Sequence, residues 1–402
     1  MSNNVGLYSD DSERIHSHTQ KKFPLPALLT LALSAFITIL TEALPAGMLN
    51  QMAASLDTSP SMAGQTVTIY AIGSLIAAIP LTAATQTVSR RKVLLTSIIG
   101  FAIANTVTAF SSSYFITMFA RFIGGVSAGL LWALLAGYAA RMVSDHLKGR
   151  AIAIALAGTP LALSLGVPAG TFLSTIIGWR ACFAIMSVLA VILIFLIRFL
   201  VPDFPGQTKG KSVSLNSVIC LKGVKSVLFV VFSYILAHNI LYTYIAPFLQ
   251  MLEMENNTDL VLLIFGISSL VGIWIVGVLI DSHLRPMTII ATTLFGLTAV
   301  ILSVENTHPI VIFVAIAIWG MSFGGAATLF QTAMTRTAGD AADVALSMLV
   351  TAWNAAIAAG GILGGILLEG FGVVSFPPAL LILLILTLIV VIKSKTGGFS
   401  IN

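Results

Sequence analysis

Charged residues are scarce in this sequence, and their scarcity decides the class of protein. Aspartate, glutamate, lysine and arginine make up 9% of the 402 residues, whereas a soluble domain carries about 25%. Hydrophobic residues reach 57% and the mean hydropathy is +1.02, which excludes a water-soluble globular domain. The net charge of +5 comes from basic residues scattered over short loops, so we expect no nucleic-acid partner.

Cysteines and clustered polar side chains are also few. Cys182 and Cys220 fall in different segments, without the spacing of a disulfide or a metal site. The apolar segments hold neither a His/Asp/Glu metal cluster nor a Ser/His/Asp set, and the loops are too short for a catalytic or sensory domain. We therefore expect no enzyme, no metal and no cofactor.

The sequence is instead rich in apolar runs, each about 17 to 25 residues long and able to cross a ~30 Å hydrocarbon core. We predict an all-α polytopic membrane protein embedded in a lipid bilayer. Its twelve transmembrane helices are expected at residues 26–49, 62–85, 93–110, 114–140, 151–173, 181–200, 226–249, 259–280, 287–303, 309–333, 344–367 and 374–392.

The distribution of lysine and arginine between these spans predicts an orientation. Nearly all basic residues lie in the loops on the same side as the two termini, and the opposite loops hold only Arg180. The positive-inside rule then places both termini in the cytoplasm. Residues 1–25 and 393–402 are the predicted cytoplasmic tails, and the first of them is too long and acidic for a signal peptide.

A cytoplasmic linker at residues 201–225, rich in Pro, Gly, Ser and Lys, separates two predicted six-helix bundles at 26–200 and 226–392. The halves resemble one another, since Gly124-Gly125 corresponds to Gly324-Gly325 and the basic turn at Arg90 to that at Arg285. Two parallel six-helix repeats with a midplane site between them form a known transporter architecture.

Several motifs in the spans match one family. They are residues 41–49, Arg121 with Gly125, Gly158 with 166–170, residues 178–180 and residues 242–249. Together they resemble the major facilitator superfamily, and within it the twelve-span drug:proton antiporters of the bacterial sugar, drug and nucleoside efflux branch. The resemblance covers residues 26–392 and implies the major facilitator fold, proton antiport, a bacterial inner-membrane location and a monomer.

The superfamily's signature between the second and third spans is incomplete here. Arg90 and Arg91 persist, but Gln86 stands where the aspartate is usual, so the resemblance does not extend to the usual charge-relay latch. Binding of these arginines to anionic headgroups is favoured over a gating role. The candidate gating residues are Arg90, Arg91, Asp281 and Arg285.

Glu42 and Arg121 are ionisable residues inside spans, where a lone arginine costs at least ~2.5 to 3.5 kcal/mol. Each lies about seven residues from the outer end of its span, which at ~1.5 Å per residue gives a matching depth. We predict a Glu42–Arg121 pair that acts as the proton site, with a static bridge between helices as the alternative. Gly125, Ala128 and Trp132 share a helical face with Arg121, and we expect this face to line the transport pathway.

The other candidate site residues lie near the expected midplane. His238 either relays a proton or binds substrate, and a neutral histidine bonded between helices is an equally weighted alternative. The candidates for proton coupling are Glu42, Arg121 and His238, and those for substrate binding are Trp132, His238, Asn239, Tyr242, Trp319, Gln331 and Asn354. For Trp132, Trp319, Phe323 and Gln331, packing or an interfacial belt is the favoured alternative. Asn354 either faces the cavity or joins helices.

Gly158, Gly166, Pro168 and Gly170 in the fifth span predict a conformational hinge. Glycine allows close helix contact, and proline removes a backbone hydrogen bond, so the helix can bend.

The interpretation that follows from these features is a proton-coupled efflux transporter working by alternating access, with the proton gradient as its energy source. The alternative is an uncoupled facilitator or a proton symporter of the same fold. A site with few charges suits sugars, nucleosides and lipophilic drugs alike.

Overall fold

The computed structural model describes residues 23–85, 87–144, 147–206, 215–304, 308–394 and 398–399. Over these residues the chain is helical, with no strand. Twelve helical segments are long and apolar enough to cross a membrane, which confirms the predicted all-α polytopic fold.

The first half of the chain forms one bundle, whose sixth spanning helix ends at Leu200. Its helices are α1 (Leu25–Gly47), α2 (Leu49–Ser55), α3 (Pro60–Ala84), α4 (Arg90–Phe110), α5 (Tyr114–Arg141), α6 (Lys148–Leu156), α7 (Gly158–Leu161), the π-helical turn η2 (Ala162–Gly166), α8 (Val167–Ile177) and α9 (Trp179–Leu200).

The second half forms the other bundle, and a short helix, α10 (Leu215–Ile219), lies in the predicted linker. The remaining helices are α11 (Val224–Thr243), α12 (Ile245–Met251), α13 (Thr258–Leu302), α14 (Pro309–Gly324), α15 (Ala326–Ala338), α16 (Ala342–Phe371) and α17 (Phe376–Lys393), with 3-10 turns at Glu255–Asn257, Gly339–Ala341 and Val373–Ser375.

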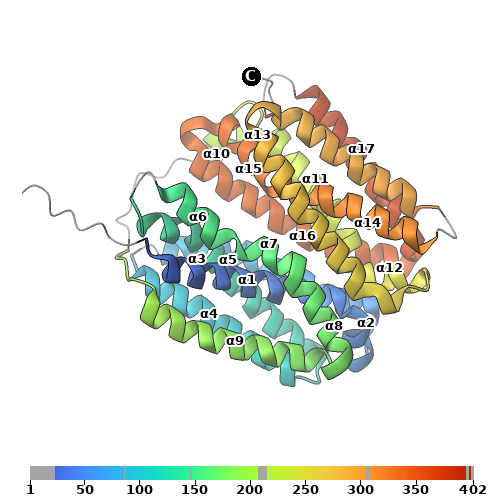
Figure 1. Ribbon diagram of the computed structural model, residues 1–402, viewed down its shortest axis with the longest axis horizontal. Coiled ribbons are helices and arrows are strands. Elements are labelled where there is room, and N and C mark those ends of the chain that lie inside the picture. The colour runs from blue at the N-terminus through green and yellow to red at the C-terminus, as the bar shows by residue number, and fades with distance from the viewer. Residues whose placement is uncertain are drawn as a thin grey trace, which may run out of the picture.

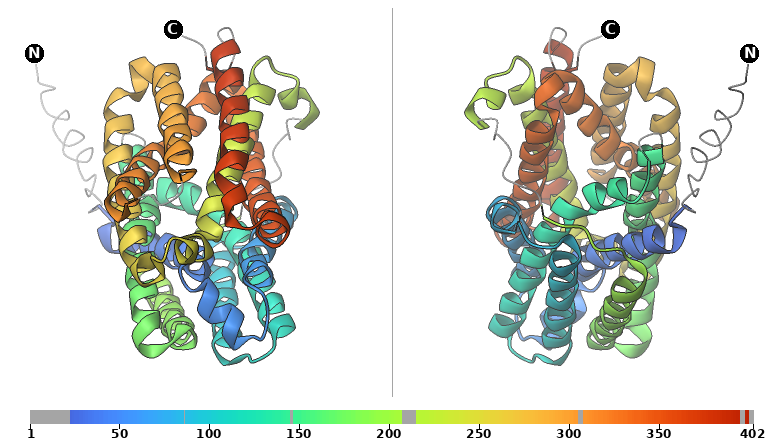
Figure 2. Two further views of the ribbon diagram at one scale, coloured as in Figure 1. Left: turned by 90° about the vertical axis from the view of Figure 1, so that its right-hand side faces the viewer. Right: turned by 90° about the vertical axis from the view of Figure 1, so that its left-hand side faces the viewer.

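The two bundles lie side by side, with α1–α9 in the lower part of Figure 1 and α11–α17 in the upper part. The views in Figure 2 show the same division. The bundles pack on one another mainly through α3 against α16 and through α8 and η2 against α13. In helix α11, every residue from Ser233 to Thr243 is buried. The two ends of the molecule are named below by their helices, as the α2/α12 end and the α6/α10 end.

Two predicted spans, 259–280 and 287–303, are joined in a single helix, α13. A kink at His283, with φ −131° and ψ 27°, marks the connection between them. Pro286 accounts for this kink, because proline has no N–H to donate to the carbonyl four residues earlier and its ring crowds that turn.

Candidate functional site

A proline break in α1 creates the environment of Arg121. Pro45 lies inside α1 and lacks the N–H that would bond the carbonyl of Thr41. Arg121, on α5 and 2% exposed, donates from Nη1 to that carbonyl at 2.5 Å. Its Nη2 donates to the carbonyl of Glu42 and its Nε to that of Thr66, both at 3.2 Å. One guanidinium therefore joins α1, α3 and α5 and replaces a hydrogen bond that the proline removes.

Glu42 adjoins Arg121 through its backbone. The predicted ion pair between the two side chains is not formed: within the described part of the chain no cation lies within ion-pair distance of the Glu42 carboxylate. The residue is partly exposed, and it lies on α1, the helix of the first bundle that contacts α11, α12 and α13 of the second. Glu42 therefore lies near the junction between the two bundles.

The face of α5 that carries Arg121, Gly125 and Ala128 is buried, so it does not line an open pathway as predicted. A Cβ at Gly125 would lie 1.9 Å from the Tyr70 carbonyl oxygen of α3, and Ala128 is 0% exposed. The guanidinium of Arg121 lies 4.8 Å from the ring centroid of Tyr70. This face serves helix packing, because the small residues let α3 approach closely. Trp132, one turn beyond, is partly buried.

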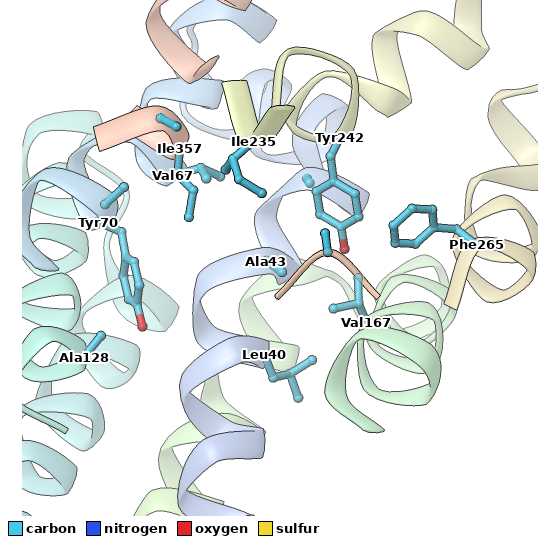
Figure 3. Close-up of a cluster of buried hydrophobic side chains, with 14 of the residues drawn as sticks. Leu40, Ala43, Val67, Tyr70, Ala128, Val167, Ile235, Tyr242, Phe265 and Ile357 are labelled. Carbon is cyan, nitrogen blue, oxygen red and sulfur yellow. The ribbon is translucent and has the colours of Figure 1, made fainter. Parts of the chain in front are cut away.

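An aromatic cluster surrounds His238 in the second bundle. The imidazole stacks on Phe323, with ring centroids 3.6 Å apart and an interplanar angle of 11°. The ring centroids of Tyr242, Trp319 and Phe265 lie 5.1, 5.3 and 5.7 Å from that of His238. Figure 3 shows Tyr242 between Ala43 of α1 and Phe265 of α13, with Val167 of α8 below it. Of the predicted substrate residues, the structure brings together His238, Tyr242 and Trp319.

His238 Nδ1 and Trp319 Nε1 are buried and make no hydrogen bond to a described residue. The alternative of a histidine hydrogen-bonded between helices through Nδ1 is therefore not what this conformation shows. Trp319 is 0% exposed and also contacts Phe295, so it packs in the core of the second bundle.

The predicted amide side chains of Asn239 and Asn354 donate hydrogen bonds within their own helices. Asn239 donates to Ile235 and Asn354 donates to Val350, each within its own helix. Both are more than nine-tenths buried, and Asn239 packs against Gly360 of α16. Gln331 is exposed on α15, and its part in substrate binding stays a prediction.

The predicted hinge is an irregular segment packed on α1. The π-helical turn η2 ends at Gly166, and the next helix begins at Val167 with Pro168 in its first turn. A Cβ at Gly158 would lie 1.9 Å from the carbonyl oxygen of Ala32, so α7 and α1 touch through their backbones. Gly166 and Gly170 also face α1, but they lie against the side chains of Phe36 and Leu44. The turn also contacts the other bundle, because Ser164 lies against Gly266 of α13.

The α2/α12 end is joined by hydrogen bonds between the bundles, which the sequence analysis missed. Tyr244 is 0% exposed, and its hydroxyl donates to the Gly361 carbonyl of its own bundle at 2.7 Å and lies 3.3 Å from the Ser61 carbonyl of the first bundle. Gln65 of α3 donates to Tyr244 at 3.2 Å and to Gly361 at 3.2 Å. Two further bonds, each 3.1 Å, join Asn50 to Gln250 and Ser59 to Glu369.

A sequence signal for this junction exists. Tyr244 lies at the break between α11 and α12, three residues before Pro247. Glu42 lies three residues before Pro45. The two prolines occupy corresponding places in the two halves, and each lies within three residues of the break in the helix that begins its bundle, at Met48 and at Tyr244.

Asp203, just after α9, bonds to the start of α4 at the α6/α10 end of the first bundle. Ser89 Oγ lies 2.7 Å from both carboxylate oxygens, and the Arg91 N–H donates to Oδ1 at 3.1 Å. Burial acts to raise the pKa of Asp203, but the bonds from Ser89 and from the Arg91 and Phe204 backbone outweigh it and hold the pKa below its ordinary value. Asp203 therefore supplies a carboxylate near the loop between α3 and α4, which has Gln86 in place of the usual aspartate.

The predicted gating residues hold the ends of helices. The Arg90 N–H donates to Phe204 at 2.9 Å, and the Arg91 guanidinium lies 3.5 Å from the Val201 carbonyl. Arg285 donates to the carbonyls of Val391 and Ile392 at the end of α17. The Asp281 side chain lies outside the described residues.

Comparison with known proteins identifies the family. The Major Facilitator Superfamily sequence model matches residues 31–345. The chain is 26% identical over 366 residues to a probable sugar efflux transporter of Helicobacter pylori (strain ATCC 700392 / 26695), covering 90% of this chain and 94% of that protein. It is 27% identical over 374 residues to the purine ribonucleoside efflux pump NepI of Escherichia coli (strain K12), covering 92% and 94%.

A solved structure shows the same fold. The xylose transporter XylE from E. coli, in a partially occluded inward open conformation, superposes with a TM-score of 0.73 at 16% identity, covering 92% of this chain and 99% of that one. The chain thus belongs to the Major Facilitator Superfamily and is a multi-pass membrane transporter, not an enzyme.

Proposed function

We propose that this transporter exports a small organic molecule across the bacterial inner membrane in exchange for protons, with both termini in the cytoplasm. The observation that carries the proposal is the Glu42 carboxylate, which lies on the helix that contacts the other bundle and has no ion partner among the described residues. Intramembrane carboxylates of this kind usually mark proton or substrate pathways.

The surroundings of Glu42 support a proton cycle. A carboxylate at membrane depth is costly in its charged form, so without a cation it favours the protonated form. Arg121 is adjacent but bound to three backbone carbonyls. A movement of α1 that brought the guanidinium onto the carboxylate would stabilise the charged form and release the proton.

The hydrogen bonds between the bundles support alternating access. They gather at the α2/α12 end, which the positive-inside rule places outside. At the α6/α10 end, the bonds of Asp203 and Arg285 join segments of the same bundle. In this conformation the junction is therefore closed toward the outside, and rocking of the bundles would open it.

The direction of transport rests on the relatives. Two proteins that match this chain over 90% or more of its length carry names of efflux transporters, one for sugar and one for purine ribonucleosides. We infer export from the cytoplasm on that ground.

The test uses purified protein in proteoliposomes with a pH-sensitive dye inside. A proton gradient is imposed, and sugars, nucleosides and cationic drugs are added in turn to wild type, Glu42→Gln and the control Glu255→Gln, which changes an exposed carboxylate. We expect substrate-dependent proton movement in wild type and in the control, and its loss in Glu42→Gln. Proton movement that survives in Glu42→Gln would assign the proton to another group, with His238 next. Substrate movement without protons would leave a facilitator.

A further inference from the structure

Thr41, the residue before Glu42, receives hydrogen bonds from two neighbouring helices. Its carbonyl oxygen accepts the bond from Arg121 of α5 at 2.5 Å. Its side-chain oxygen Oγ1 accepts a second bond, from the amide nitrogen of Asn105 on α4 at 3.1 Å. Thr41 and Asn105 are at most 1% exposed. The proline break of α1 is therefore held from α4 and from α5 at a single residue.

The amide of Asn105 uses only part of its bonding capacity. Its oxygen Oδ1 is buried and makes no hydrogen bond to a described residue. A buried acceptor left without a donor costs free energy comparable to what one hydrogen bond contributes. An apolar side chain of similar shape would therefore fill this position about as well. Packing alone does not account for an amide beside the proton site.

The bond from Asn105 bears on where Arg121 can bind. In this conformation the guanidinium donates to the backbone carbonyls of Thr41 and Glu42, not to the Glu42 carboxylate. The movement of α1 that brings the guanidinium onto the carboxylate draws the Thr41 carbonyl away from it. The same movement stretches the bond between the Thr41 side chain and α4. The amide of Asn105 therefore opposes the pairing of Arg121 with Glu42.

Titratable side chains face this part of α1 from three other helices. Arg121 lies on α5, Tyr70 of α3 donates a hydrogen bond to α1 at 3.1 Å, and Tyr242 of α11 lies beside α1 (Figure 3). Tyrosine hydroxyls are ordinarily neutral below about pH 10. The position of the Arg121 guanidinium is therefore what decides how easily Glu42 becomes charged.

We propose that Asn105 is a positioning residue of the proton site. Through Thr41 it holds α1 where Arg121 binds backbone carbonyls, and so keeps the cation away from the Glu42 carboxylate. This inference rests on the proposed proton cycle and adds a residue that controls it. Without the bond from Asn105, the guanidinium reaches the carboxylate more often, so Glu42 takes up its proton only at a lower pH.

The test measures the protonation of Glu42 on full-length protein in detergent, without substrate or a proton gradient. Dicyclohexylcarbodiimide reacts with the protonated form of a carboxyl group in an apolar site. The extent of Glu42 labelling against pH, read by mass spectrometry, therefore gives the midpoint of its titration. We expect a lower midpoint in Asn105→Leu than in wild type, by up to about one pH unit, the equivalent of one net hydrogen bond.

Two further variants show whether the shift arises through Thr41. Thr41→Val removes the acceptor of the same bond, so it should lower the midpoint as Asn105→Leu does, and combining the two should add nothing. Thr108→Val is the matched control, because it lies on the same helix, is 1% exposed, and its hydroxyl donates to Ala104 within that helix. It should leave the midpoint unchanged.

An unchanged midpoint in a folded Asn105→Leu would overturn the inference, and so would additive shifts in the two variants. A merely structural amide predicts a lower melting temperature without a shift of the midpoint. If Asn105→Leu does not fold, Thr41→Val decides by the same criterion. Labelling of Glu42 that does not depend on pH in wild type would also overturn the inference, because a proton site must titrate.

The outcome is separate from that of proton antiport. A midpoint that shifts in a protein whose substrate moves without protons would contradict the antiport and keep the role of Asn105. Antiport that depends on Glu42, with a midpoint that Asn105→Leu leaves unchanged, would do the reverse.

Discussion

Arg121 donates its shortest hydrogen bond to the carbonyl oxygen of Thr41, at 2.5 Å. This carbonyl would have bonded residue 45 in a regular helix, and residue 45 is a proline. The arginine therefore completes the backbone hydrogen bonding of α1 at its break, immediately beside Glu42. It also fixes the position of Glu42 relative to α3 and α5.

Arg121→Met should lower the free energy of unfolding, because it leaves a buried carbonyl without a donor, a loss of about 1–3 kcal/mol. In a Pro45→Ala background, the introduced alanine supplies an N–H to the Thr41 carbonyl, so the same substitution should cost less. The melting temperatures of the four proteins in detergent, taken as a double-mutant cycle, measure this coupling. Additive effects of the two substitutions would contradict the role assigned to Arg121.

Tyr244→Phe should loosen the α2/α12 end. The ring still fits against Gly64 and Gly364, but the bonds that join the hydroxyl to Gln65 and Ser61 of the first bundle are lost. A net loss of about 0.5–1.5 kcal/mol per bond would raise the population of the open end several-fold.

The measurement for Tyr244→Phe is disulfide cross-linking between cysteines introduced at Asn50 and Gln250, with Cys182 and Cys220 replaced by serine. We expect less cross-linking in Tyr244→Phe. Tyr114→Phe is the matched control, since Tyr114 donates to Met62 within one bundle, and it should leave cross-linking unchanged. Equal cross-linking in all three proteins would argue against a gate at Tyr244.

Gly158→Ala should impair transport and stability together. Its methyl group would collide with the Ala32 carbonyl and push α7 away from α1, and overpacking of this kind costs about 1–3 kcal/mol. Gly137→Ala on α5 is the control, because its added Cβ meets nothing within 4 Å. That change should be neutral or slightly stabilising, by up to about 1 kcal/mol. Melting temperature and substrate uptake by vesicles report both effects, and a fully active Gly158→Ala would contradict tight backbone contact.

Asp203 should make stability depend on acidity. Its pKa in the folded protein is below the ordinary value, so its contribution is present above the unfolded pKa of about 3.9 and is lost as the pH falls through the folded pKa. Asp203→Asn should melt lower than wild type near neutral pH, and the difference should shrink as the pH falls below about 4. Because the residue is exposed, the effect should stay below about 1 kcal/mol. A difference that is constant from pH 7 to pH 3 would exclude this linkage.

Local patterns in the sequence determined the twelve spans, because hydropathy over about 20 residues depends on composition alone. The glycines of the fifth span were also predictable as a place of close contact and bending, because a residue without a side chain lets helices approach closely and bend. The joining of two spans in α13 was not predicted, although Pro286 marks the kink. Each of these features depends on residues that lie close to it in the chain.

Only the tertiary structure decided which groups meet across the bundles. Matching depth suggested a Glu42–Arg121 ion pair, but three carbonyls bind the guanidinium, and one of them is free only because of Pro45. Helical spacing placed Arg121, Gly125 and Ala128 on one face but gave no sign that α3 covers it. The partners of Tyr244 and Asp203 lie 179 and 114 residues away in the chain. Periodicity describes one helix at a time, whereas these contacts depend on how helices pack against one another.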